Sequence, residues 1–250
     1  MTSLRHLHVN VHVVLQDNIY LSLDSDDEED SEELGGFFEL ENLVSFSYPS
    51  LSCGEDTEKI MKRLPNLRKL KCIFFESRYS SKNCDQFPRL NFLTQLESLS
   101  IFYYGTPLNT NEFNLPLNLK ELSLSNFHLP WIHISVIGRL PNLAVLKLLS
   151  GAFEGRRWDM REEEFPELKF LKLESLNIAQ WNASSDHLPK LERLVLQNCK
   201  DLEKIPYDFA DITTLEMIEV HWCRQSAENS AKEIGEATGE IKVLIRSSNL

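Results

Sequence analysis

The residues whose spacing comes closest to a metal site are three histidines near the amino terminus. His6, His8 and His12 occupy even-numbered positions, so an extended strand would place all three on the same face. Imidazole nitrogens are common zinc ligands. No carboxylate or thiol joins them at a ligand spacing, however, and an exposed strand explains the three histidines equally well. We therefore predict no metal site.

The other polar residues form no familiar catalytic pattern. The sequence has no GxxxxGK[ST] phosphate loop, no GxGxxG dinucleotide loop and no HExxH metalloprotease motif. The carboxylate-rich run from Arg161 to Glu164 is typical of a solvated turn. We predict that the chain is not an enzyme and that it binds no cofactor and no small-molecule substrate.

The cysteines indicate a reducing compartment. They are odd in number and contain no CxxC pair, which argues against a disulfide framework or a zinc site. The amino terminus lacks the apolar core of a signal peptide, and no apolar run approaches the roughly 18 residues of a membrane span. We therefore expect a cytoplasmic protein whose thiols are all free: Cys53, Cys72, Cys84, Cys199 and Cys223.

The elements that must position any functional side chain are copies of one phrase, L-x-x-L-x-L-x-x-N/C, the signature of a leucine-rich repeat. Its clearest copies run from Leu191 to Cys199 and from Leu215 to Cys223. Each phrase predicts a short strand whose alternate residues point inward. An apolar residue and a proline precede five of the phrases. Proline lacks the N–H that a position inside a sheet would donate, so it suits the turn just before a strand. The first leucines of the phrases are Leu4, Leu43, Leu67, Leu96, Leu119, Leu143, Leu168, Leu191 and Leu215.

This pattern predicts an α/β fold. Most neighbouring first leucines are separated by about 20–29 residues, the range of this repeat class. Stacked repeats place their strands side by side. The expected architecture is therefore a leucine-rich repeat solenoid of about nine to ten repeats, with a curved parallel sheet on the concave face and an irregular or short helical convex side.

We treat residues 1–250 as one repeat domain with two irregular parts. The gap between Leu4 and Leu43 contains residues 24–33, of which eight are acidic, and such a block predicts a disordered loop inserted between the first and second repeats. Without those eight acids the formal net charge of −12 would be −4. Residues 226–250 are predicted to form a terminal cap, with Ser226 starting a helix over 227–234 and a strand following over 241–245. The amino end has no comparable cap, which is typical of an array that continues upstream.

The outward strand positions are the candidate binding surface. We expect the third, fifth, seventh and eighth residues of each phrase to face the concave side. Aromatic, methionine and arginine side chains are enriched at interface centres, although large residues can also simply cover a sheet. Lys147 and Lys172 would lie side by side, which is unfavourable unless an acidic partner or Glu174 offsets them. The candidate partner-binding residues are Lys69, Lys71, Phe74, Phe102, Tyr103, Lys147, Phe170, Lys172, Arg193, Met217 and Trp222.

The net charge argues against nucleic acid as a partner, because 26 basic residues against 38 acidic ones give no broad positive field.

Two short helices are predicted in the connections between strands. Residues 55–64 begin with acids and end with bases, as a helix prefers, and residues 134–140 predict another short helix.

Several stretches resemble the leucine-rich repeat tail of plant intracellular immune receptors of the coiled-coil, nucleotide-binding type, in particular the solanaceous late blight resistance proteins. They are CGEDTEKIM from Cys53, LPNLRKL from Leu64, IPYDFADITTLEMIEV from Ile205 and the end of the chain around EIKV from Glu240. The L-x-G-x-I-P rhythm of extracellular plant repeats is missing. The resemblance implies effector recognition and autoinhibition leading to hypersensitive cell death, in a cytoplasmic protein associated with membrane peripheries as in the family.

The resemblance has one large gap, because the chain contains neither a coiled-coil region nor a nucleotide-binding module. Nucleotide binding and signalling are therefore not carried over to these residues. The implied partners are a pathogen effector or guarded host protein and, in a full-length receptor, its nucleotide-binding module. The alternative is a different cytosolic adaptor, such as the substrate-binding repeat module of a ubiquitin ligase.

Overall fold

The computed structural model describes residues 4–8, 41–52, 55–75, 89–105 and 114–247. These belong to two compact units, Met1–Pro116 and Leu117–Leu250, here called unit 1 and unit 2. The predicted acidic loop over 24–33, His12, Cys53 and Cys84 lie outside the described residues.

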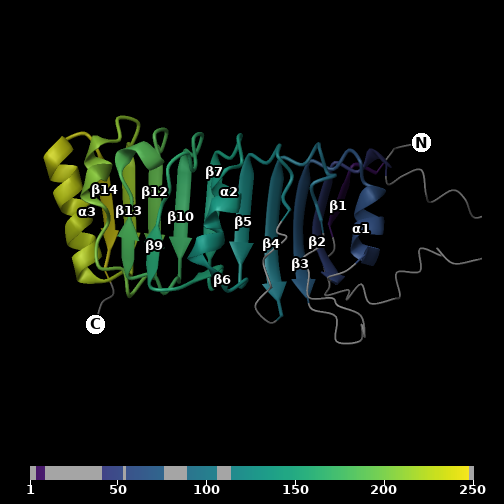
Figure 1. Cartoon of the computed structure of the whole chain (residues 1–250), viewed down its shortest axis with the longest axis horizontal. Coiled ribbons are helices and arrows are strands. Elements are labelled where there is room, and N and C mark those ends of the chain that lie inside the picture. The colour runs from purple at the N-terminus through teal and green to yellow at the C-terminus, as the bar shows by residue number, and fades with distance from the viewer. Residues whose placement is uncertain (1–3, 9–40, 53–54, 76–88, 106–113, 248–250) are drawn as a thin grey trace, which may run out of the picture. The chain divides into compact units, whose positions relative to one another are not determined.

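Unit 1 is built on parallel strands that lie side by side in chain order (Figure 1). They are β1 (His6–His8), β2 (Ser45–Ser52), β3 (Lys69–Phe75) and β4 (Ser98–Tyr104). Helix α1 (Glu55–Lys62) connects β2 to β3 and ends two residues before the predicted boundary.

Unit 2 repeats the same plan with six parallel strands in chain order. They are β5 (Glu121–Ser125), β7 (Val145–Leu149), β10 (Phe170–Glu174), β12 (Arg193–Gln197), β13 (Met217–His221) and β14 (Lys242–Arg246). A long parallel sheet with few helices confirms the predicted α/β leucine-rich repeat class.

The repeat leucines form the core, as the alternation predicts. The first leucine of each phrase is at most 5% exposed from Leu43 to Leu215, whereas Leu4 is 37% exposed. The fourth-position leucines Leu99 and Leu146 are also buried. Burying one leucine side chain stabilises a fold by about 1.5–3 kcal/mol, so this repeated position holds each strand to its neighbours.

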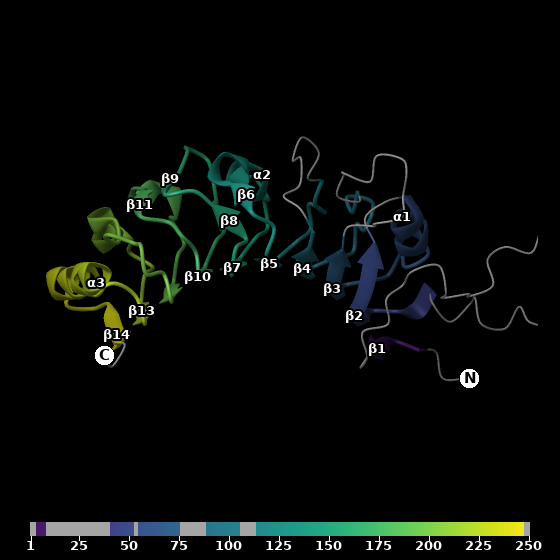
Figure 2. The same ribbon diagram turned by 90° about the horizontal axis from the view of Figure 1, so that it is seen from below.

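A second layer covers the inward side of the unit 2 sheet (Figure 2). It contains two short parallel sheets and helix α2 (Ile134–Gly138), which ends two residues before the predicted boundary. The short strands are β6 (Leu129–Pro130) with β8 (Phe153–Glu154), and β9 (Arg157–Asp159) with β11 (Gln180–Asn182). The 3-10 turns are η3 (Trp131–His133), η4 (Ser185–His187) and η5 (Tyr207–Asp211).

Stacked tryptophans join the repeats within this layer. The ring centroids of Trp131 and Trp158 are 4.6 Å apart, and those of Trp158 and Trp181 are 5.0 Å apart. Trp131 Nε1 donates to the Gly155 carbonyl oxygen at 3.0 Å. Gly155 has φ +124°, and a side chain there would meet Trp131 at 3.1 Å, so glycine is required for this close approach. The second layer therefore contains an aromatic core that joins successive repeats of unit 2.

Unit 2 ends in the helix and strand expected over 226–250. Helix α3 (Gln225–Thr238) buries Ala227, Ala231 and Ile234, the face that the sequence predicts. The helix starts earlier than predicted, because its N-cap is Arg224 and not Ser226. It also continues past the predicted end at residue 234 to Thr238, where Gly239 with φ +69° forms the C-cap. Strand β14 then pairs in parallel with β13.

Candidate functional site

The candidate surface is the outward face of each sheet, which we define as the face bearing the third, fifth and seventh positions of the repeats. Strand register places equivalent positions side by side: His8 lies opposite Ser47 and Ser47 opposite Lys71 in unit 1, and in unit 2 Lys147 lies opposite Lys172. Facing residues on neighbouring strands lie close enough to share one ligand.

In unit 2, Phe170 lies between two cations. The Lys147 Nζ is 5.9 Å and the Arg193 Cζ 5.8 Å from the centre of its ring. Register explains the arrangement, because Phe170 pairs with Val145 on one side and Arg193 on the other. Phe170 is half-buried and Lys147 is exposed. The cations thus hold the aromatic ring at the outward surface.

The predicted conflict between Lys147 and Lys172 is resolved inside the sheet. The two residues are paired in register, and Lys172 Nζ lies 2.6 Å from Glu174 Oε2 on the same strand. Both members of this ion pair are half-buried. Lys147 makes no ion pair with any described residue, so it is the cation of this pair that remains open to a partner.

A second ion pair, between Arg193 on β12 and Glu219 on β13, neutralises both charges on the neighbouring strands. Arg193 Nε donates to Glu219 Oε1 at 2.6 Å, and its Nη2 also contacts that oxygen. His221 Nε2 lies 3.1 Å from Glu219 Oε2. Burial alone would raise the pKa of the Glu219 carboxyl, but hydrogen bonds from His221 and Arg193 outweigh it and hold that pKa below its ordinary value. Glu219 is therefore a structural anion at neutral pH.

Trp222 and Met217 complete the predicted residues of unit 2. Met217 is half-buried, while Trp222 is 43% exposed. Trp222 directly follows β13 and has φ +55°, a left-handed conformation that turns its side chain out of the strand alternation. Its ring centroid lies 6.0 Å from that of His221. Trp222 is thus presented to solvent beside the ion-paired cluster.

In unit 1, Lys69 and Lys71 are exposed on β3, as predicted. The Lys71 Nζ lies 4.6 Å from the centre of the Tyr48 ring, and His8 approaches the same ring edge-on at 5.0 Å. Tyr48 has φ +64° and lies where the β2–β3 register shifts between Ser47 and Ser50. A β-bulge of this kind re-aims a side chain, so Tyr48 joins the outward face although the repeat frame did not select it.

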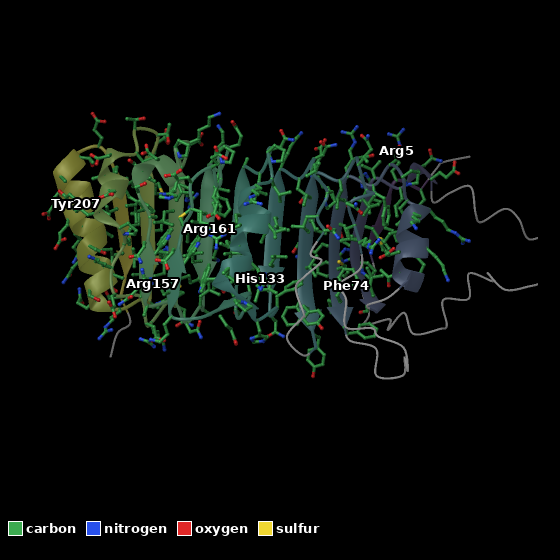
Figure 3. All side chains as sticks on the ribbon, in the orientation of Figure 1. Arg5, Phe74, His133, Arg157, Arg161 and Tyr207 are labelled. Atoms are coloured by element: carbon green, nitrogen blue, oxygen red, sulfur yellow. The ribbon has the colours of Figure 1, made fainter. Side chains whose placement is uncertain are left out.

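Two predicted residues of unit 1 face the other way. Phe74, labelled in Figure 3, is 0% exposed and Tyr103 is 2% exposed, so the prediction that they line the outward surface is wrong. Both hold the eighth position of their repeats, but β3 and β4 extend for seven residues and continue to alternate there. In unit 2, five-residue strands end earlier, and the eighth residue is left-handed at Asn126, Ser175 and Asn198.

The same alternation presents side chains that the sequence analysis missed. Phe102 is 44% exposed, as predicted, and Tyr104, two residues further along β4, is 64% exposed. Leu244 on β14 is 39% exposed and pairs with Glu219. Extending the period of two beyond the seventh position would have identified Tyr104. The Tyr48 bulge has no comparable signal in the sequence.

Among the residues that the structure describes, no group of three or more histidine, cysteine, aspartate or glutamate side chains could hold a metal ion. Cys72, Cys199 and Cys223 are free thiols, and the first two are buried.

Glu164 departs from the predicted solvated turn, because it is 3% exposed and accepts hydrogen bonds from the Ser135 hydroxyl at 2.6 Å and the Arg161 amide at 3.0 Å. Its carboxylate ties α2 to the next turn.

Exposed charges of the second layer are paired locally. Arg157, labelled in Figure 3, donates from Nε to Asp159 Oδ1 at 2.8 Å, and the Asn182 side chain donates to the same oxygen at 2.6 Å. These hydrogen bonds, from Asn182 first and then Arg157, lower the pKa of the Asp159 carboxyl.

No helix of the described part of the chain is long and apolar enough to cross a membrane.

The repeat strands, the buried leucines and the outward-facing row define a leucine-rich repeat protein. A family model described as a leucine-rich repeat region matches residues 1–244, and the chain belongs to this family.

Similar proteins of known name show which leucine-rich repeat proteins this chain resembles. A putative late blight resistance protein homolog of Solanum demissum is 38% identical over 208 residues, which cover 80% of this chain and 17% of the relative. The late blight resistance protein R1-A of the same species is 38% identical over 204 residues, or 80% of this chain and 15% of that protein. A further putative homolog is 35% identical over 243 residues, covering 96% of this chain and 29% of the relative. The chain thus spans less than a third of the length of these relatives, and its resemblance to late blight resistance proteins is confirmed.

Proposed function

We propose that this chain is the protein-recognition and regulatory repeat module of a plant disease-resistance receptor, which senses a pathogen effector or a guarded host protein and contributes to the hypersensitive response. The partners are proteins, including the receptor's own nucleotide-binding module in a full-length receptor. The site of action is the cytoplasm, with association at membrane peripheries. The similarity to late blight resistance proteins supports this assignment.

The observation that carries the proposal is the outward face of unit 2. Phe170, with Lys147 and Arg193 beside it, lies in the same register row as Met217, and Trp222 is exposed directly after the end of β13. Aromatic, methionine and arginine side chains at adjacent positions are typical of interface centres. A module built for recognition rather than catalysis needs this type of surface and no reactive constellation.

The test is capture of candidate effectors by the purified 250-residue chain. Secreted proteins of a late blight pathogen are passed over the immobilised chain and over variants of it. We expect Trp222→Ser and Lys147→Glu to reduce capture of a bound effector at least tenfold. The matched control is Tyr207→Ser, since Tyr207 is 59% exposed but belongs to η5 of the second layer.

Two outcomes would contradict the proposal. One is that no effector is retained. The other is that retention depends on Tyr207 as strongly as on Trp222. A bound effector should also trigger cell death in leaves only when the matching full-length receptor is present, and an effector response without the receptor would remove the regulatory part of the proposal.

A further inference from the structure

The outward face of unit 1 is graded from positive to aromatic along its strands. At the third and fifth positions, β3 carries Lys69 and Lys71. At the seventh position Ile73 pairs with Phe102, and in the row beyond it Phe75 pairs with Tyr104. Two cationic rows are therefore followed by two apolar rows on one face.

The two lysines have no anionic neighbours in the sheet. Lys69 pairs with Ser45 on β2 and Ser98 on β4, and Lys71 pairs with Ser47 and Ser100. Neither lysine makes an ion pair with any residue that the structure describes, and both are exposed. Small serines on both sides flank the two cations, so a carboxylate from another molecule can approach without displacing a partner among the residues that the structure describes.

The aromatic rows are open as well. Phe102 is 44% exposed, Tyr104 64% and Tyr48 38%, while Ile73 is half-buried between them. Adjacent exposed apolar side chains of this kind mark protein contact sites more often than single ones do. Lys71 lies over the Tyr48 ring, which holds its charge at the border between the cationic and apolar rows.

From this gradient we propose that unit 1 binds an extended protein segment in which acidic side chains are followed, at two-residue spacing, by aromatic or large aliphatic ones. Successive outward rows are about 7 Å apart, and the alternate side chains of an extended peptide have the same repeat. Acidic residues then lie over Lys69 and Lys71 while apolar residues cover Ile73, Phe102 and Tyr104. This inference rests on the proposed recognition function and names the partner chemistry for unit 1.

The probe is a fluorescein-labelled peptide, Glu-Ser-Glu-Ser-Phe-Ser-Phe, titrated with the full 250-residue chain at low salt. Each exposed ion pair is worth about 0–1 kcal/mol, or up to about fivefold in affinity. We therefore expect the double variant Lys69→Glu with Lys71→Glu to weaken binding about tenfold or more, and Phe102→Ser to weaken it several-fold. A peptide with glutamine in place of glutamate should also bind more weakly, by less than the double variant does, because it removes the attraction without adding repulsion.

Lys232→Glu is the matched control, since it reverses an exposed cation on helix α3 of unit 2, outside the proposed binding surface, and should change probe affinity less than twofold. Thermal unfolding of each variant checks that the fold is retained. Because Lys69 and Lys71 are exposed and lie between serines, reversing their charge should leave the fold intact. Equal binding by the double variant, or equal binding of the glutamine peptide, overturns the inference. Effector capture that depends on Trp222 in the same preparation would leave the proposed function standing, so the two failures are distinguishable.

Discussion

The outward faces of the two units carry similar residues but use their charges differently. In unit 2 the cations Lys172 and Arg193 are paired with Glu174 and Glu219 on the same face. In unit 1 the neighbours of Lys69 and Lys71 are serines, and the exposed apolar side chains lie beside them. Internal pairing orients side chains but reduces the charge that a partner can sense, whereas unpaired cations attract and orient anionic partners. Unit 2 thus offers a pre-organised aromatic surface, and unit 1 offers an electrostatic one.

The repeat leucines of the inward faces, by contrast, are equivalent in the two units. Leu99 in unit 1 and Leu146 in unit 2 hold the same fourth position of their repeats and are 1% and 0% exposed. Substitutions on the inward and outward faces can therefore test the repeat frame and the proposed binding surfaces separately.

The largest expected effect is on stability. Leu146→Ala and Leu99→Ala should each lower the free energy of unfolding by about 2–5 kcal/mol, because each leaves a cavity among the repeat leucines. Lys147→Ala, the outward neighbour of Leu146, should change it by less than about 0.5 kcal/mol. Chemical denaturation of the three variants measures this. An unchanged midpoint for either leucine variant would show that its unit does not use the repeat frame assigned above.

The next effect concerns the internal pairing of unit 2. Glu219→Gln should destabilise the protein by about 1–3 kcal/mol, because Glu219 is 8% exposed and the variant leaves Arg193 and His221 without their anion. Glu174→Gln is the control. Since its partner Lys172 is partly solvated, that change should cost only about 0–1 kcal/mol. Equal losses in the two variants would mean that burial does not distinguish these pairs.

The pH dependence of the Glu219→Gln difference follows from the lowered pKa of Glu219. A carboxyl whose pKa is lower in the folded than in the unfolded state stabilises the fold above its unfolded pKa, and the contribution is lost as pH falls through the folded pKa. The stability difference between wild type and variant should therefore shrink as pH falls below the ordinary carboxyl pKa of 4.5. A difference that does not shrink as pH is lowered from 4.5 would contradict this assignment.

A smaller effect is expected from the acidic run over 24–33. If it competes with anionic partners for the lysines, as its eight acids suggest, deleting it should tighten binding of the glutamate–phenylalanine probe several-fold at low salt. Screening reduces the reach of charges to about 8 Å at physiological salt, so the two affinities should converge there. Replacing the eight acids by their amides is the matched control and should mimic the deletion. Equal affinities at low salt would mean that the run is only a solvated insertion.

The smallest effect is expected from the cysteines. All five thiols should titrate as free after denaturation, and a reductant should leave the melting temperature unchanged. In the native protein Cys223 should alkylate before Cys72 and Cys199. A hydrogen bond from Cys199 lowers the pKa of the Cys223 thiol, whereas burial raises the pKa of Cys72, and the bond to Cys223 together with burial raises that of Cys199. Any disulfide in freshly alkylated protein would contradict the prediction of a reducing compartment.

The sequence by itself determined the repeat frame. Leucines at the first, fourth and sixth positions have to leave water, and an extended strand can bury them on one side only by exposing the third and fifth positions. For this reason the outward residues Lys71, Lys147, Phe170 and Arg193 could be selected by counting. The terminal helix and strand were predictable in the same way, from the apolar spacing of Ala227, Ala231 and Ile234.

Tertiary structure alone decided where each strand stops and which charges meet. The eighth position faces the core at Phe74 and Tyr103 because their strands run on, but turns outward at Trp222 because β13 ends and the backbone becomes left-handed. Those lengths depend on pairing with neighbouring strands, which local sequence does not encode. The same holds for the buried Glu164, whose partner Ser135 is 29 residues away, and for Arg193 with Glu219, 26 residues apart. Pairs so distant in the chain become neighbours only when the repeats stack.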